Sequence, residues 1–168
     1  MIKPPVPPLT CGPLMLRLLE ERDLELTRAW RNRDEIREWF VSAEQIAAQQ
    51  HRAWFDTYLQ KSDDFVFVIE ETRVLRRPIG QASLYHVDFG AGRAEFGRLM
   101  IGDPAARGRG FGAVATKGLV AMALDQWRLR EVYLEVKAAN HRAIGIYEEC
   151  GFTTVGVNGE MLLMRAQK

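Results

Sequence analysis

The chain has 168 residues, enough for one domain with a substantial core. Its 23 basic and 22 acidic residues leave a net charge of +1, so no overall field would attract nucleic acid or an anionic membrane. No apolar run approaches the roughly 20 residues that span a bilayer, and the start of the chain lacks the features of a secretory signal. We therefore expect a cytoplasmic protein.

Cysteine and histidine usage excludes two further classes of protein. Cys11 and Cys150 are too few for a disulfide framework, and Cys150 lies in a helical pattern that is typical of a buried free thiol. His51, His86 and His141 are scattered singly, without the spacing of metal ligands. The sequence thus predicts neither a disulfide scaffold nor a metal site.

The first 13 residues differ in composition from the rest of the chain. Five of them are prolines, which lack a backbone donor and fix their own φ angle. We expect a flexible Pro-rich tail over residues 1–13 and one folded domain over residues 14–168.

Beyond this tail, the spacing of apolar residues predicts both helices and strands. Ser42 and Gln45 match a capping box at a helix start, and Asn158-Gly159 between two β-like runs predicts a tight hairpin. In chain order we predict a strand over 14–19, helices over 21–31 and 42–61, strands over 64–71, 79–88 and 93–101, a helix over 112–127, a strand over 132–136, a helix over 140–150 and a hairpin over 153–164. This order indicates an α/β (α+β) domain with a mixed sheet, in which the three middle strands form an antiparallel meander.

The segment 107–112, Arg-Gly-Arg-Gly-Phe-Gly, lies between a predicted strand and a predicted helix. Its glycines allow successive backbone N–H groups to converge on an anion, and the following helix adds partial positive charge. We call this segment the anion loop. It lacks the lysine and hydroxyl of a Walker-A loop and the spacing of a dinucleotide-binding loop. A loop that merely turns the chain remains the alternative.

These residues carry a resemblance to a known family. Arg107-x-x-Gly110-x-Gly112 matches the Q/R-x-x-G-x-G/A motif of the GNAT acetyltransferases, and residues 135–152 resemble their second conserved block. The similarity covers residues 14–164. It implies acetyl-CoA-dependent acetylation of a primary amine. It also implies a seven-stranded, mostly antiparallel sheet with helices on both faces, whose two central parallel strands splay apart near Ile101 and Val136.

The resemblance also assigns residues to acetyl-CoA. The backbone of strand residues would pair with the pantetheine arm, the anion loop would hold the pyrophosphate, and one face of the last long helix would line the sulfur end. The implied cofactor-binding residues are Met100, Ile101, Arg107, Gly108, Arg109, Gly110, Phe111, Gly112, Asn140, Ala143 and Tyr147.

Acetyl transfer needs a neutral amine, whereas an alkylammonium has a pKa of about 10.4, so a base must remove a proton. Glu135 and Glu95, on the two central strands, are the candidates, and strand periodicity alone leaves both open. The alternative role for such a glutamate is an ion pair with an arginine such as Arg98. Tyr147 is the candidate general acid for the departing thiolate, with simple packing as its alternative.

The acceptor half of the chain resembles one branch of the GNAT family. The W-R-N element at Trp30 and the H-x-x-W-F element at His51 are similar to ribosomal-protein N-acetyltransferases and to amino-sugar N-acetyltransferases of the pseudaminic acid pathway. A nucleotide-linked amino sugar would need stacking aromatics and a cation for its diphosphate. The candidate substrate-binding residues are Trp30, Arg31, Trp39, Tyr85 and His86.

Other acceptors remain open at this point. The final hairpin is short, whereas many relatives in that branch close the acceptor site with a longer insertion, so protein N-termini, polyamines and aminoglycosides stay candidates. A non-catalytic acyl-CoA-binding module is the alternative from another class. Exposed sheet edges also allow a homodimer.

Overall fold

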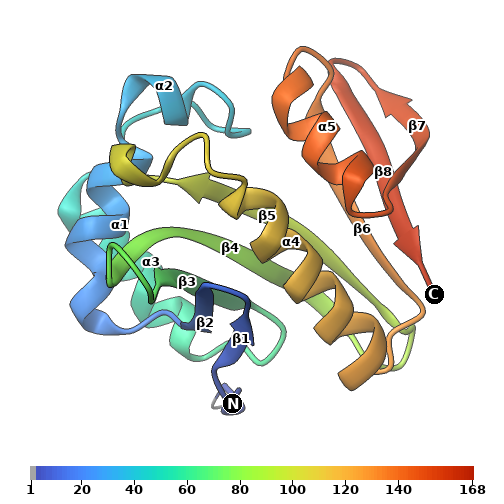
Figure 1. Cartoon of the computed structure of the whole chain (residues 1–168), viewed down its shortest axis with the longest axis horizontal. Coiled ribbons are helices and arrows are strands. Elements are labelled where there is room, and N and C mark those ends of the chain that lie inside the picture. The colour runs from blue at the N-terminus through green and yellow to red at the C-terminus, as the bar shows by residue number, and fades with distance from the viewer. Residues whose placement is uncertain (1–2) are drawn as a thin grey trace.

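The computed structural model describes residues 3–168 and shows an eight-stranded sheet with helices on both faces (Figure 1). The strand order is β1-β2-β3-β4-β5-β6-β8-β7, and neighbours are antiparallel except for the parallel pair β5–β6. The strands are β1 (Leu9–Cys11), β2 (Leu14–Leu18), β3 (Phe65–Glu71), β4 (Arg77–Asp88), β5 (Arg93–Ile101), β6 (Glu131–Lys137), β7 (Thr153–Asn158) and β8 (Met161–Gln167). The helices are η1 (Glu21–Asp23), α1 (Leu24–Arg31), α2 (Asp34–Arg37), α3 (Ala48–Leu59), η2 (Pro104–Ala106), α4 (Phe111–Ala121), η3 (Met122–Gln126) and α5 (His141–Glu149).

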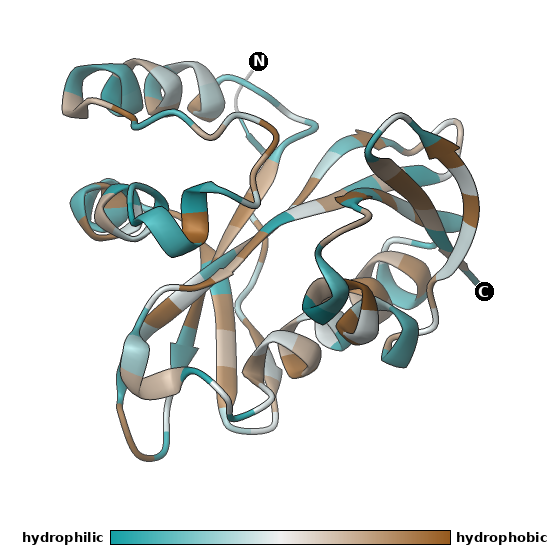
Figure 2. Cartoon of the chain, turned by 90° about the horizontal axis from the view of Figure 1, so that it is seen from above, coloured by the Kyte–Doolittle hydropathy of each residue, from teal (hydrophilic) through white to brown (hydrophobic). Residues whose placement is uncertain are grey.

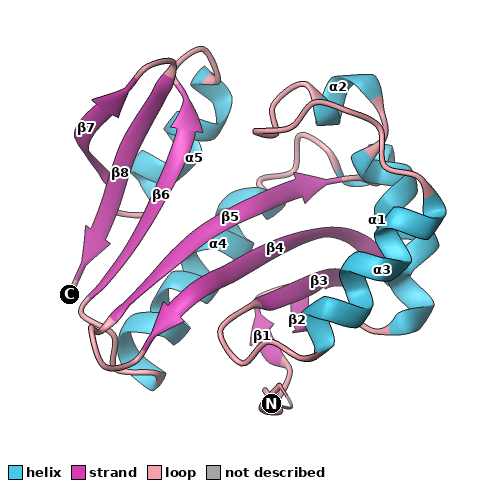
Figure 3. Cartoon of the chain, turned by 180° about the vertical axis from the view of Figure 1, so that it is seen from behind, coloured by secondary structure: helices cyan, strands magenta, loops and turns pink. Residues whose placement is uncertain are grey.

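The sheet separates two helical layers. Helices α1 and α3 lie on one face, and α4 and α5 lie on the other (Figures 1 and 3). Apolar residues are concentrated in the strands and in the helices that pack on them (Figure 2). Strand β3 is buried on both faces: Phe65 and Phe67 join the core beneath α4, whereas Val66 and Val68 pack with Phe55 of α3. Its nearly continuous β-branched and aromatic run therefore suits a central strand.

A buried ion network fixes the start of the acceptor half. The Arg17 guanidinium on β2 donates to both Asp23 carboxylate oxygens at 2.8 and 2.9 Å and to Glu70 on β3 at 2.7 Å. The Asp23 carboxylate also accepts from the Glu20 amide at 2.8 Å. This network joins β2, β3 and η1, and so sets where α1 leaves the sheet.

The predicted meander is confirmed, because β3, β4 and β5 are consecutive and antiparallel. The count of seven strands is wrong, since β1 pairs with β2 from Leu9–Leu16 to Cys11–Leu14 and makes an eighth. Residues 9–11 were expected in the flexible tail. Three residues between prolines and a glycine give too short a pattern to predict a strand.

The predicted helix over 42–61 begins later, at Ala48, and the expected capping box at Ser42 and Gln45 lies in the preceding loop. The Gln50 side chain instead accepts from the Ala47 amide at 3.0 Å, so the start is fixed three residues before Gln50. The four-residue helix α2 was not predicted, because it is shorter than any periodic signal. Within residues 3–168, no helix is long and apolar enough to cross a membrane.

Candidate active site

The two central parallel strands pair over only three positions. Register partners run from Arg93–Glu131 to Glu95–Tyr133, and beyond them β5 and β6 diverge (Figure 1). The edge of β5 that faces β6 therefore has no strand partner along its C-terminal half. A bulge follows Gly97, where Arg98 has a left-handed φ of 54°. Such a break in pairing re-aims backbone groups and is common beside active sites.

Met100 and Ile101 lie at the end of this unpaired edge, as predicted. The Met100 side chain is buried with Trp30 and Ile36, whereas its backbone belongs to the diverging strand. The Ile101 carbonyl already accepts from Nε of Arg107 at 3.2 Å. The end of β5 is therefore tied directly to the anion loop.

The anion loop precedes α4 in the expected geometry. Gly108 and Gly110 have φ angles of 74° and 77°, a region that glycine adopts without the penalty other residues incur. Gly110 is the N-cap of α4, so the free amides of the first turn and the positive end of the 11-residue helix face the loop. A Cβ on Gly112 would lie 3.5 Å from Ile146, an ordinary van der Waals distance, so α4 and α5 approach each other here without requiring a glycine.

The two arginines of the loop differ from each other. Arg107 is half-buried and pairs with Glu35 at 3.4 Å as well as with the Ile101 carbonyl, so it is held rather than mobile at the rim. Arg109 is exposed and follows the expectation of a free cation near the loop. The backbone amides, with Arg109, fit a pyrophosphate in both geometry and charge.

Helix α5 presents the predicted cofactor-side residues on one face. The Asn140 side chain caps the helix by accepting from the Ala143 amide at 3.2 Å. One turn further, the Tyr147 ring packs edge-on against Phe96 and Phe152 with centroid distances of 5.9 and 5.8 Å. Burial, with a smaller contribution from Cys150, raises the pKa of Tyr147. This phenol therefore keeps its proton throughout the neutral range.

Glu95 is the better positioned of the two candidate bases. Its side chain is only 16% exposed and lies at the last paired position before β5 and β6 diverge. The Tyr85 hydroxyl donates to Oε2 at 2.9 Å, and Nδ1 of His86 lies 2.9 Å from Oε1. Phe96, the next residue, packs on Tyr147, so alternation places Glu95 on the opposite face of the strand.

Glu135 lies on the same face of the sheet, one strand away. Val132, Leu134 and Val136 of β6 are buried beneath α4 and α5, which turns Glu135 to the other side, where it is exposed. Burial, and then the charge of Glu95, raise the pKa of Tyr133, with smaller contributions from Glu131 and Glu135. The carboxylates of Glu95, Glu131 and Glu135 thus lie near Tyr133 on this face, together with the Arg93 guanidinium, which pairs with Glu131 at 3.1 Å.

The arginine suspected of pairing with a strand glutamate has another partner. Arg98 forms a bidentate pair with Asp64 at 2.8 and 3.3 Å, and its guanidinium lies 4.2 Å from the centroid of the Tyr85 ring. A Cβ on Gly97 would lie 2.8 Å from the Tyr85 hydroxyl, so this glycine makes room for Tyr85 to cross β5. Neither contact is visible in the sequence, because both depend on the register of β4 against β5.

The five predicted acceptor residues are not brought together. Trp30 is 3% exposed and packs against Gly102, and Arg31, 9% exposed, donates to the Ser42 carbonyl, so neither offers an open face. Trp39 is 42% exposed, on the loop whose Glu38 carbonyl accepts from Lys137 at 2.6 Å. Tyr85 and His86 meet at Glu95, as described above.

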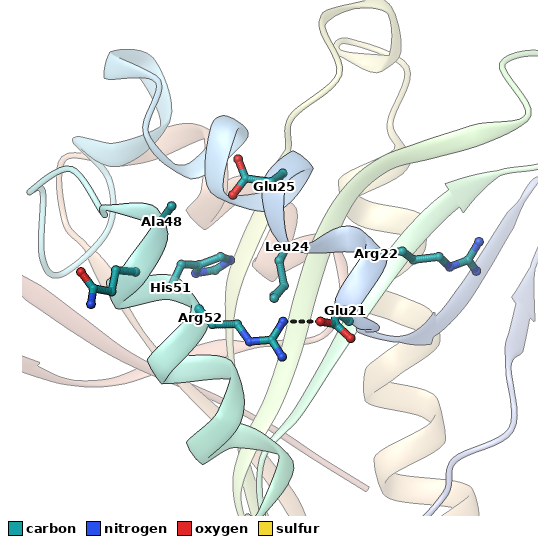
Figure 4. Close-up of a pocket in the computed structure, with 8 residues that line it drawn as sticks. Glu21, Arg22, Leu24, Glu25, Ala48, His51 and Arg52 are labelled. Atoms are coloured by element: carbon teal, nitrogen blue, oxygen red, sulfur yellow. Dashed lines mark hydrogen bonds and ion pairs between the residues drawn. The ribbon is translucent and has the colours of Figure 1, made fainter.

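A hollow of about 510 Å³ lies elsewhere, between η1, α1 and α3 (Figure 4). Its charged side chains already have ion-pair partners: Arg52 pairs with Glu21 across the hollow, and Glu25 pairs with Arg28 outside it at 3.0 Å. None of the predicted site residues lines it. Among the residues that the structure describes, no group of histidine, cysteine and carboxylate side chains could hold a metal ion.

Comparison with known proteins agrees with this geometry. The family model described as "Acetyltransferase (GNAT) domain" matches residues 13–153. Spermidine N(1)-acetyltransferase of Vibrio cholerae is 25% identical over 143 residues, covering 85% of this chain and 80% of the relative. Mycothiol acetyltransferase of Acidothermus cellulolyticus is 32% identical over 137 residues, covering 78% of this chain but only 40% of the relative.

Solved structures show the same fold. The Vibrio cholerae spermidine N-acetyltransferase in complex with CoA and spermine superposes with a TM-score of 0.83 at 23% identity, covering 93% of this chain and 96% of that one. A domain from Methanocaldococcus jannaschii gives a TM-score of 0.79 at 20% identity, covering 92% and 98%. The protein belongs to the GNAT acetyltransferase family. It is an N-acetyltransferase that uses acetyl-CoA.

Proposed function

We propose that this enzyme acetylates a primary amine of a small linear polyamine, with Glu95 as the base and Tyr147 as the acid. The observation that carries the proposal is the position of the Glu95 carboxylate, at the last pair before β5 and β6 diverge and on the face opposite Tyr147. A base and an acid on opposite sides of a gap between strands suit an amine and a thioester that approach from opposite sides.

The reaction then follows from these two side chains. Glu95 takes a proton from the ammonium, directly or through water, and the freed amine attacks the acetyl carbonyl. The new C–N bond forms as the C–S bond breaks, and Tyr147 gives its proton to the departing thiolate. The second N–H proton, which the nitrogen loses as the amide forms, restores the Tyr147 phenol directly or through water. The amides of residues 108–112 would hold the pyrophosphate, and the free edge of β5 would pair with the pantetheine arm.

Charge on the acceptor face supports a polyamine. Glu95 and Glu135 both lie close enough to Tyr133 to affect its pKa, whereas Glu131 on the same face is paired with Arg93 at 3.1 Å. A chain with a second ammonium would therefore meet the carboxylates of Glu95 and Glu135 there. The comparisons support the same acceptor class, since the sequence match and the solved structure cited above are both a spermidine N-acetyltransferase of Vibrio cholerae.

The amino-sugar acceptor expected from the sequence is the alternative. Its diphosphate would need free cations, but three arginines of this region donate to the protein itself. Arg31 donates to the Ser42 carbonyl, Arg33 to the Gly102 carbonyl at 2.5 Å, and Arg37 to Asp34 and the Ala43 carbonyl. These contacts favour a cationic acceptor over a nucleotide-linked one.

Release of free thiol from acetyl-CoA tests the proposal. The panel contains spermidine and other polyamines, nucleotide-linked amino sugars, aminoglycosides and peptides with free N-termini. We expect the highest kcat/KM with a polyamine. Preference for a nucleotide-linked sugar or for a peptide would overturn the acceptor assignment, and tight acetyl-CoA binding without any transfer would favour the non-catalytic module.

Two further expectations remain part of this proposal: a cytoplasmic location and self-association. Strand β7 is an edge strand of six uncharged residues with Val155 and Val157 exposed, a composition that invites pairing. One solved structure of the Vibrio cholerae relative is described as dodecameric. Light scattering at the assay concentration would show whether this chain forms a homodimer or a larger assembly.

A further inference from the structure

Two consecutive residues hold the same carboxylate. The Tyr85 hydroxyl donates to Oε2 of Glu95 and the His86 ring lies at Oε1, both at 2.9 Å. Consecutive side chains of a regular strand point to opposite faces of the sheet. Convergence of Tyr85 and His86 on one group therefore requires a departure from the regular strand.

A bulge provides that departure. Tyr85 pairs with Glu95 and Asp88 pairs with Arg93, so β4 has one residue more than β5 between these two pairs. His86 lies in this bulge and has a left-handed φ of 48°, a conformation that is rare for residues other than glycine. Backbone outliers of this kind persist at functional sites because the surrounding structure holds them in place.

The bulge joins a buried group to water. The Glu95 side chain is 16% exposed, whereas the His86 side chain is 63% exposed. The imidazole thus contacts the carboxylate through Nδ1 and remains open to solvent. Histidine is the side chain best suited to pass protons near neutral pH.

The other ionisable groups around Glu95 come from β5 itself and from β6. Tyr133 is its partner on β6, with the Arg93 guanidinium 4.3 Å from the centroid of that ring, and Arg98 lies over Tyr85. Glu131 and Glu135 extend the same face of β6. Among residues 3–168, the side chains that hydrogen-bond to Glu95 are Tyr85 and His86, and His86 alone of the two is exposed.

We infer that His86 is the proton outlet of the Glu95 base, an inference that rests on the acetyl transfer proposed above. Each turnover leaves the proton of the amine on Glu95, and it must leave before the next cycle. The carboxyl proton passes from Oε1 to Nδ1, the imidazolium releases its Nε2 proton to water, and the exposed ring regains its tautomer by exchange with solvent. His86 acts through Glu95 and is in that sense a positioning residue.

Rescue by an external base separates this relay from a purely structural role. In weakly buffered solution we expect H86A and H86Q to have a kcat about tenfold below that of the wild-type enzyme, and added imidazole to restore it progressively. H51Q is the matched control. His51 contacts the Thr27 hydroxyl at 3.3 Å and no carboxylate, so imidazole should leave kcat of H51Q unchanged.

The outcomes distinguish the relay from the proposed function. A wild-type kcat in H86A, or a loss that ignores imidazole and buffer concentration, would overturn the relay alone. E95Q should stay slow at every imidazole concentration, because its base is missing. A fully active E95Q, or absence of turnover with every amine, would overturn the proposed function and the relay together.

Discussion

Glu95 and Tyr133 are the last residues that pair before the two central strands separate. This pair marks the point where β5 stops contributing to the sheet and its backbone becomes available to a ligand. The carboxylate proposed as the base therefore lies where the sheet opens, held by Tyr85 and His86 from the neighbouring strand. The following predictions depend on this arrangement.

The two glutamates should differ in their effect on catalysis. We expect Glu95→Gln to lower kcat about a hundredfold or more, because the side chain keeps its shape but cannot accept the proton. Glu135→Gln should mainly raise KM for a polyamine, since Glu135 is exposed and lies two residues beyond Tyr133, the β6 partner of Glu95. Steady-state kinetics of both variants test this. A larger loss of kcat in Glu135→Gln would indicate that Glu135 is the base and that Glu95 binds the substrate.

Tyr147 should act as a proton donor up to unusually high pH. Its pKa is raised above the ordinary tyrosine value of 10.0 by burial, and a raised pKa keeps the phenol protonated as pH rises through that value. We expect Tyr147→Phe to lower kcat roughly tenfold to a hundredfold while acetyl-CoA still binds. If the wild-type enzyme lost activity near pH 10 and the phenylalanine variant did not, Tyr147 would be ionising normally and this account of its proton would be wrong.

The glycines with left-handed φ angles in the anion loop should contribute to acetyl-CoA binding. Gly110→Ala places a Cβ at a φ of 77°, which costs roughly 1–2 kcal/mol, so the Kd for acetyl-CoA should rise about tenfold. Gly145→Ala is the matched control, because Gly145 is in α5 with open space around it. That substitution should stabilise the fold by about 0.5–1 kcal/mol. Calorimetry measures the Kd for acetyl-CoA of both variants. Equal Kd values would contradict the role of the anion loop in binding acetyl-CoA.

The Arg17–Asp23 pair should be the ion pair that stability depends on most. The two side chains are 8% and 5% exposed. Asp23→Ala removes the bidentate partner of the buried guanidinium and leaves it only Glu70, so the loss should approach about 3 kcal/mol. Glu25→Ala removes a pair whose carboxylate is 74% exposed and should leave the free energy of unfolding almost unchanged, because solvent screens an exposed pair. Urea denaturation gives the free energy of unfolding of both variants. Similar losses would contradict the stabilising role of the buried Arg17–Asp23 pair.

The same pair predicts how stability depends on pH. Burial alone would raise the pKa of Asp23, but hydrogen bonds from Arg17 and the Glu20 amide outweigh it and hold the pKa below 3.8. A lowered folded-state pKa means that this contribution is complete above the unfolded value and is lost as pH falls below it. Unfolding curves down to about pH 3 should therefore show a steeper decline for the wild-type protein than for Asp23→Asn.

The local structure of the anion loop could be predicted from the sequence, whereas the arrangement of the proposed acceptor residues could not. The anion loop is a local motif, so Gly108, Gly110 and the start of α4 could be placed from consecutive residues. The choice between Glu95 and Glu135 as the base could not be predicted from the sequence, because it depends on which side chains of β4 contact each carboxylate. Periodicity gives the face on which a side chain lies, but neither its burial nor its partners.

Other differences have similar causes. Strand β1 and helix α2 have three and four residues, too few to show a period. The bulge at His86 follows from the register between two strands, which no single segment encodes. The sequence predicted Trp30 as a stacking surface for the substrate, but its ring packs against Gly102 and is buried in the core. That contact depends on how the chain folds and has no local signal.

The most direct test of the central claim follows free CoA during incubation of acetyl-CoA with spermidine, for the wild-type enzyme and Glu95→Gln in parallel. We predict that the wild-type enzyme releases CoA only when the amine is present, and that Glu95→Gln binds acetyl-CoA normally but releases CoA at least about a hundredfold more slowly. Amine-dependent release at the same rate in both proteins would contradict the assignment of Glu95 as the base at the point where the central strands separate.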